Sequence, residues 1–201
     1  MRDVGPGLLL ALAVWVVIQG VQAVFLLFRD EFALHEAWNQ FGPAGLLGGV
    51  LGQLLGNALL EETVFRGFFL PQFYLKATRV FPRGAALAIA LLGSQVLFAV
   101  SHLPNRFFLM GQTGLDILWG QFVLVVAGLI LAAVYLLTRN LFFVVGFHVL
   151  WNAPVPIFQS LHQNTLHAMT IGLFLLVSIG WWRIDRNRQV DEGGRVENES
   201  A

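Results

Sequence analysis

Residues 42–70 read GPAGLLGGVLGQLLGNALLEETVFRGFFL, an apolar segment of membrane-crossing length that ends in a charged cluster. No Asp, Glu, Lys or Arg occurs in residues 42–60, and residues 67–70 are apolar again. A helix needs about 20 apolar residues to cross a hydrocarbon core of about 30 Å, and helix is the open-chain structure that satisfies its own backbone in lipid. We therefore predict a membrane-spanning helix that carries Glu61, Glu62 and Arg66 near its end.

The composition of the whole chain is typical of a membrane protein and excludes a soluble globule. Hydrophobic residues make up 57% of the 201 residues and charged residues 12%, whereas soluble domains carry about 25% charged residues. The 12 basic and 12 acidic residues balance, so there is no basic excess that would attract nucleic acid. Cysteine is absent, which excludes disulfide scaffolds, thiolate metal sites and cysteine nucleophiles.

Five further runs have the length and apolar character of membrane spans. None of them contains Asp, Glu, Lys or Arg, and the last two contain isolated His and Asn residues. The runs are residues 8–28, 84–101, 117–138, 141–158 and 165–182. We predict an all-α, polytopic membrane helical bundle with six transmembrane helices. It forms one domain, residues 1–182, and residues 183–201 have the polar composition of a disordered cytoplasmic tail.

The positive charges predict how the bundle is oriented. With both termini in the cytoplasm, the inner segments hold nine Lys and Arg residues, and the outer loops hold two, Arg29 and Arg106. Cytoplasmic loops retain basic residues, and this count requires an even number of crossings. An alternative for the first run is a cleaved signal peptide, because Val21-Gln22-Ala23 loosely resembles a small-residue cleavage site.

Glu61, Glu62 and Arg66 require partners, because a charge at the bilayer centre costs about 3 kcal/mol even on lenient insertion scales. Residues four apart share a helix face, and Glu before Arg is the favourable order, so Glu62 and Arg66 are expected to neutralise each other. Glu61 points about 100° away from Glu62 and has no partner in its own helix. Glu61 is therefore the better candidate for chemistry, as a general base.

Partners for Glu61 are found in two other predicted spans. His102 ends the third span, four residues after Phe98, and His148 lies in the fifth span, four residues before Asn152. Each of these pairs shares a helix face. A Glu that takes a proton from water, an imidazole that orients the water and a His/Asn pair that donates to an oxyanion are the parts needed to hydrolyse an amide.

Three motifs in this order resemble those of a protease family. Residues 61–66, EETVFR, fit EExxxR; residues 98–102, FAVSH, fit FxxxH; and residues 148–152, HVLWN, fit HxxxN. The chain thereby resembles the CPBP intramembrane proteases, which include type II CAAX prenyl endopeptidases and bacteriocin-processing or self-immunity proteins. The motif-bearing core covers about residues 46–158.

The resemblance implies a glutamate-type endopeptidase with no required cofactor. It implies that Glu61 and His102 activate water, that His148 and Asn152 form the oxyanion site, and that three residues support them: Glu62, Arg66 and Phe98. We expect a hydrophobic or membrane-anchored peptide substrate, the lipid bilayer as surroundings and no nucleic-acid partner. The small number of spans favours a bacterial plasma membrane. Helix lengths permit a site in the cytoplasmic half if the basic residues 71–83 project from the membrane or lie on it.

Two alternatives use the same residues differently. Two His and a carboxylate form a known catalytic zinc set, so a metalloprotease would use Glu61, His102 and His148 as ligands. A non-catalytic immunity or scaffold protein would use the polar residues only for packing or partner binding. It would depend instead on the glycine stripe Gly48, Gly52 and Gly56, whose four-residue spacing predicts close helix packing.

Overall fold

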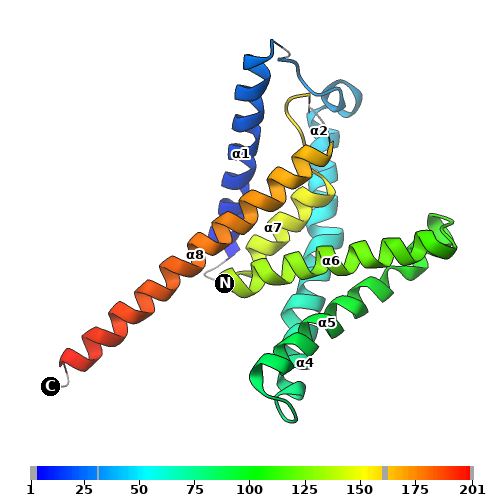
Figure 1. Cartoon of the computed structure of the whole chain (residues 1–201). Coiled ribbons are helices and arrows are strands. Elements are labelled where there is room, and N and C mark those ends of the chain that lie inside the picture. The colour runs from blue at the N-terminus through cyan, green and yellow to red at the C-terminus, as the bar shows by residue number, and fades with distance from the viewer. Residues whose placement is uncertain (1–3, 31, 160–162, 200–201) are drawn as a thin grey trace.

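The computed structural model describes residues 4–30, 32–159 and 163–199, and most of them are helical (Figure 1). The elements, in which η marks a π-helical segment, are α1 (Val4–Phe28), α2 (Ala37–Leu51), η1 (Gly52–Ala58), α3 (Leu59–Glu62), η2 (Thr63–Phe69), α4 (Leu70–Ala77), α5 (Arg83–Ser101), η3 (Asn105–Leu109), α6 (Gly114–Thr138), α7 (Leu141–Asn152) and α8 (Gln163–Glu199). Within these ranges, β pairing is limited to one bridge between Leu34 and Phe158. The predicted all-α class is confirmed.

Five of the described helical stretches are long and apolar enough to cross a membrane: Val4–Phe28, Ala37–Ala77, Arg83–Leu109, Gly114–Thr138 and Thr165–Asn187. Large apolar side chains cover their outer faces; Leu9, for example, is 66% exposed and Trp119 is 67% exposed. Apolar surface that is continuous on this scale marks a contact with lipid. The chain is an integral membrane protein, and the predicted polytopic bundle is confirmed.

The span predicted over residues 141–158 is shorter in the structure, because α7 ends at Asn152. Its 12 residues rise about 18 Å, less than a full hydrocarbon core. Pro154 and Pro156 follow directly, and proline restricts the residue before it and removes a helix donor. Hydrogen bonds hold this segment outside a helix: the Trp38 indole N–H donates to the Pro156 carbonyl at 2.8 Å, and Ile157 accepts from His35 N–H.

The span predicted over residues 42–60 is longer in the structure. It belongs to a helical stretch of 41 residues, Ala37–Ala77, that continues through the charged cluster. The helix continues because Glu62 and Arg66 form an ion pair within it, with Nη1 and Oε1 3.0 Å apart, so neither charge has to leave the apolar surroundings. Near its start the stretch is kinked at Gly42, whose φ of 65° is accessible to glycine.

Helix α7 lies at the centre of the bundle, with α1, α6 and α8 packed around it. Its residues from Phe143 to Val149 are all buried, as expected for a helix that is apolar on every side. A Cβ at Gly146 would collide with Ala11, so this glycine lets α1 approach α7 closely. The predicted close approach at Gly48, Gly52 and Gly56 is wrong, because none of the residues that the structure describes comes within 4 Å of a Cβ built there.

Helix α8 contains the last membrane-length segment and then extends beyond it. Its apolar part is Thr165–Asn187, and α8 packs against α1, α6 and α7. The helical backbone continues to Glu199, across most of residues 183–201, whose composition predicts disorder. The disordered tail and the domain boundary at residue 182 stay predictions.

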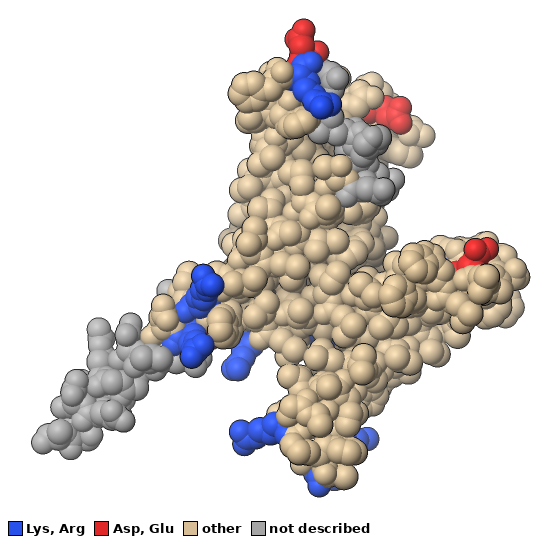
Figure 2. Space-filling view, in the orientation of Figure 1, with Lys and Arg blue, Asp and Glu red and all other residues tan. Residues whose placement is uncertain are grey.

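Charged side chains are distributed unevenly along the molecule. Most of the Lys and Arg side chains seen in Figure 2 lie at the end that holds the α4–α5 turn and around the middle of α8. Asp and Glu are seen at the opposite end, where basic side-chain atoms are visible as well, and at the tip between α5 and α6. The α4–α5 turn contains Arg79, with Lys76 near the end of α4 and Arg83 at the start of α5. This turn extends beyond the α6–α7 turn (Figure 1). The position of this turn agrees with the projection of residues 71–83 that a common depth for the candidate residues requires, while the projection from a membrane stays a prediction.

Candidate active site

Glu61 lies between two imidazoles from helices that are distant in the sequence. Its Oε1 is 3.7 Å from Nε2 of His102, and its Oε2 is 3.7 Å from Nε2 of His148. The three residues belong to α3, to the C-terminal end of α5 and to α7, so helix packing brings them together. The structure therefore contains the predicted convergence, while the catalytic roles of these residues stay predictions.

In both imidazoles the other ring nitrogen, Nδ1, is held by an oxygen. Nδ1 of His102 lies 2.9 Å from the Phe98 carbonyl, and Nδ1 of His148 lies 2.7 Å from Oε1 of Glu62. Since a carbonyl or carboxylate oxygen only accepts, both Nδ1 atoms carry a proton and donate it. Each Nε2 facing Glu61 is therefore an acceptor in the neutral ring and a donor in the imidazolium.

Glu62 and Arg66 form the predicted ion pair, and both side chains are fully buried. A second guanidinium nitrogen, Nη2, donates to Oε1 of Gln95 at 3.1 Å and to the carbonyl oxygen of Gly128 at 3.0 Å. Glu62 thus joins Arg66 to His148, because its Oε1 accepts from both. A buried ion pair requires such additional hydrogen bonds to offset the desolvation of its two charges.

Phe98 contacts the site in three ways. Its carbonyl accepts from His102 Nδ1, its ring lies edge-on to the His102 ring with centroids 4.7 Å apart, and the Arg66 guanidinium carbon lies 4.9 Å from its ring centroid. A cation over an aromatic face is attracted by the ring quadrupole. Arg66 is therefore connected to both imidazoles, through Glu62 to His148 and through Phe98 to His102.

Asn152 lies one helical turn beyond His148 on α7, at a more exposed position. Its Nδ2 donates to Oε1 of Gln53 on η1 at 3.4 Å. Asn152 is thus held at the seam between α7 and η1. Gln53 is a contact that motif spacing does not reveal, since its sequence signal is only that it is one of two amides, with Asn57, in an apolar span.

The local backbone around Glu61 and Glu62 is unusual. The four-residue helix α3, which carries both carboxylates, is flanked by the π-helical segments η1 and η2. Such wide turns inside α-helices occur frequently at functional sites. They also change the angle between successive side chains. Glu61 and Glu62 both lie in the α-helical segment α3, whereas Arg66 lies in η2 and still pairs with Glu62 four residues earlier.

The cluster is partly accessible from outside. The side chain of Glu61 is 15% exposed and that of His102 is 26% exposed, whereas that of Glu62 is fully buried. Oε2 of Glu61 is buried and accepts no hydrogen bond from the described residues. It therefore retains the capacity to accept a proton from a small donor that reaches the site.

The zinc alternative assigns Glu61, His102 and His148 as ligands. Within residues 4–30, 32–159 and 163–199, no group of three or more His, Asp or Glu side chains is arranged to hold a metal ion. The two oxygens of Glu61 face different imidazoles, instead of all donors facing one point. The residues do not fit zinc in this arrangement.

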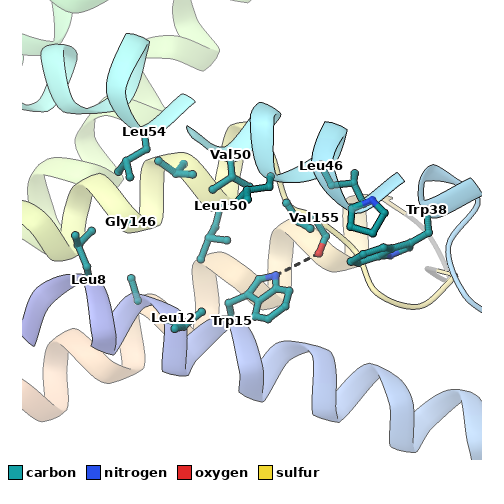
Figure 3. A pocket seen from close by; sticks show the side chains of 14 residues that line it. Leu8, Leu12, Trp15, Trp38, Leu46, Val50, Leu54, Gly146, Leu150 and Val155 are labelled. Carbon is teal, nitrogen blue, oxygen red and sulfur yellow. Dashed lines mark hydrogen bonds between the residues drawn. The ribbon is translucent and has the colours of Figure 1, made fainter. Parts of the chain in front are cut away.

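A separate apolar pocket of about 470 Å³ lies between α1, the α2–η1 stretch and α7 (Figure 3). It is lined by Leu8, Ala11, Leu12, Trp15, Trp38, Pro43, Leu46, Leu47, Val50, Leu54, Gly146, Val149, Leu150 and Val155. The Trp15 indole donates to the Val155 carbonyl at 3.3 Å and closes one part of the wall. Val149 directly follows His148, so the pocket and the cluster share α7.

An integral membrane bundle that gathers two carboxylates, two imidazoles and an amide has the parts of a hydrolase inside the membrane. The family model described as Rce1-like, type II CAAX prenyl endopeptidase Rce1-like, matches residues 43–154, and the chain belongs to this family. It is thus a member of a CAAX-type intramembrane protease family, as its motifs imply. No curated protein and no solved structure matches it. The matched segment contains every candidate residue named above.

Proposed function

We propose that the protein is an intramembrane endopeptidase in which Glu61 and His102 activate water and His148 and Asn152 stabilise the oxyanion. The observation that carries the proposal is the position of two imidazole Nε2 atoms, each 3.7 Å from a different oxygen of Glu61. This separation is too long for a direct hydrogen bond, but a water that lies beside the two atoms can contact the carboxylate and an imidazole together. Family membership supports protease activity in general.

The proposed reaction balances with the residues of this chain. The Glu61 carboxylate accepts a proton from water while the water oxygen bonds to the peptide carbonyl carbon, which forms a tetrahedral oxyanion. The carbon–nitrogen bond then breaks, and the proton passes from Glu61, directly or through His102, to the leaving nitrogen. The products are a carboxylic acid and an amine.

The charges around His148 support its role as an oxyanion donor. Nδ1 of His148 lies 2.7 Å from Oε1 of Glu62, and its Nε2 lies 3.7 Å from Oε2 of Glu61, so an imidazolium here would have a carboxylate at each ring nitrogen. In that form Nδ1–H donates to Glu62 and Nε2–H is available to an oxyanion. Asn152 can take part as well, because its amide has two N–H groups and Gln53 accepts one of them.

The proposed activity is tested with the purified full chain in liposomes and a lipid-modified CAAX peptide, the substrate class named in the family description. We expect mass spectrometry to show release of a C-terminal fragment. A folded protein that cleaves neither this peptide nor an unmodified hydrophobic peptide contradicts the proposal.

We further propose that the apolar pocket receives the hydrophobic part of the substrate, because it adjoins His148 along α7. Leu12 lines the pocket, so Leu12→Trp is expected to raise KM about 10-fold with little change in kcat. The control is Leu9→Trp, the same change on the same helix at a lipid-facing residue that does not line the pocket. Equal KM values in both variants contradict this use of the pocket.

The proposed location is a bacterial plasma membrane with the active site towards the cytoplasm, as the gathering of Lys and Arg at one end supports (Figure 2). Because the chain has no cysteine, single cysteines report their side of the membrane directly. In intact cells, a membrane-impermeant maleimide is expected to label Ala33→Cys in the α1–α2 loop but not Val80→Cys in the α4–α5 turn. The opposite pattern contradicts the orientation.

A further inference from the structure

Gln95 is a fully buried polar residue on helix α5, and none of the three motifs includes it. Its Oε1 accepts from Nη2 of Arg66 at 3.1 Å, and its Nε2 donates to Oγ of Ser94 at 2.8 Å. Ser94 in turn donates to the Leu91 carbonyl at 3.1 Å. A guanidinium only donates, so the amide oxygen must face Arg66, and Ser94 holds the amide in that orientation.

Gly128 on α6 forms the other side of this contact. Its carbonyl accepts from the same Nη2 of Arg66 at 3.0 Å. A Cβ built at Gly128 would collide with Oε1 of Gln95 and lie 3.3 Å from Nη2 of Arg66. The side chains of Gln95 and Arg66 thus occupy the space that any residue larger than glycine would fill.

We propose that Gln95 and Gly128 are positioning residues of the active site, which form a socket for the Arg66 guanidinium and through it fix Glu62 and His148. The inference rests on the proposed function. Two neutral oxygens hold Nη2, so Nη1 is directed at Glu62. Oε1 of Glu62 is then fixed where it accepts from Nδ1 of His148, and Nε2 of His148 is turned towards Glu61.

The neutrality of the socket matters as much as its shape. Among the described residues, Glu62 is the acidic side chain paired with Arg66. A third carboxylate at the socket would compete with Glu62 for the guanidinium and add charge to a buried cluster. An amide and a backbone carbonyl supply acceptor oxygens to Nη2 without that competition.

The test compares Gln95→Leu and Gly128→Ala, which damage the socket from two helices, with the native chain in liposomes. Both variants are expected to lower kcat about 10- to 100-fold with KM nearly unchanged, because His148 is displaced from the reacting atoms. The matched control is Gln121→Leu on α6, whose amide atoms are buried without a hydrogen-bond partner in the described structure. It is expected to keep native kcat.

A second measurement does not depend on turnover. In protein labelled with ¹⁵N-histidine, the His148 Nδ1–H that donates to a carboxylate gives a far-downfield proton signal, assigned by its loss in His148→Gln. We expect Gln95→Leu and Gly128→Ala to shift or abolish this signal and Gln121→Leu to preserve it.

The outcomes separate the two proposals. The positioning role is wrong if either socket variant has the same unfolding temperature as the native protein and also keeps the native kcat and the native His148 signal. If the native chain and Glu61→Gln cleave the peptide equally while the His148 signal still depends on Gln95, the socket stands and the proposed catalytic role of Glu61 is wrong.

Discussion

Glu61→Gln is expected to lower kcat by about 10²- to 10⁴-fold, the usual contribution of a positioned general base. Glutamine keeps the size of the side chain and its ability to accept a hydrogen bond, but it cannot take a proton from water. Because Glu61 faces two Nε2 atoms and has no ion pair with Arg66, the variant should fold and bind substrate with a similar KM. Steady-state cleavage of the lipid-modified peptide measures kcat and KM, and a thermal unfolding curve shows whether the variant is folded.

Glu36→Gln is the matched control for this experiment, since Glu36 precedes α2, far from the cluster in sequence, and makes no side-chain cap. It should retain native activity. A Glu61→Gln variant with native turnover contradicts the proposed mechanism, and an unchanged cellular phenotype would favour the non-catalytic alternative. A chelator added to the native enzyme tests the zinc alternative: we expect full activity, and loss that added zinc restores would show that a metal is required.

The membrane class and the convergence of the site could be predicted because each rests on a strong local signal. Uncharged runs of about 20 residues have few interpretations apart from membrane spans. Charged side chains inside such a run are either paired with an opposite charge or have a function. This rule identified Glu61, Glu62 and Arg66 as candidates. The separation of Glu62, paired with Arg66, from Glu61, which is not, follows from helix geometry and agrees with the contacts in the structure.

The contacts made by neutral residues could not be predicted in the same way. Gln95 and Gly128 come from α5 and α6, and only the packing of these helices on η2 brings them to Arg66. Ideal helix spacing also fails near the two π-helical segments. The stripe Gly48, Gly52 and Gly56 predicts a close helix contact, yet its Cβ positions meet open space. The sites of close approach are isolated glycines such as Gly146, whose role depends on the neighbouring helix.

Arg66→Met is expected to destabilise the protein by about 3–5 kcal/mol, the usual cost of removing one partner from a buried ion pair. Methionine fills much of the same volume but leaves Glu62, which is fully buried, without its cation. The variant also loses the donors to Gln95 and Gly128. Unfolding by a denaturing detergent in mixed micelles measures the change in free energy. Arg79→Met, at an exposed residue of the α4–α5 turn, should change it by less than about 0.5 kcal/mol.

A double variant shows whether the uncompensated charge causes this loss. In Arg66→Met/Glu62→Leu both charges are absent, and replacing a whole buried pair by apolar side chains is often neutral for stability. We therefore expect the double variant to be more stable than Arg66→Met alone, with a coupling energy above about 1 kcal/mol, as is found for residues in direct contact. It should nevertheless be inactive, because His148 loses the carboxylate that holds its Nδ1. Additive effects of the two substitutions would mean that Glu62 and Arg66 do not form the buried pair on which the position of His148 depends.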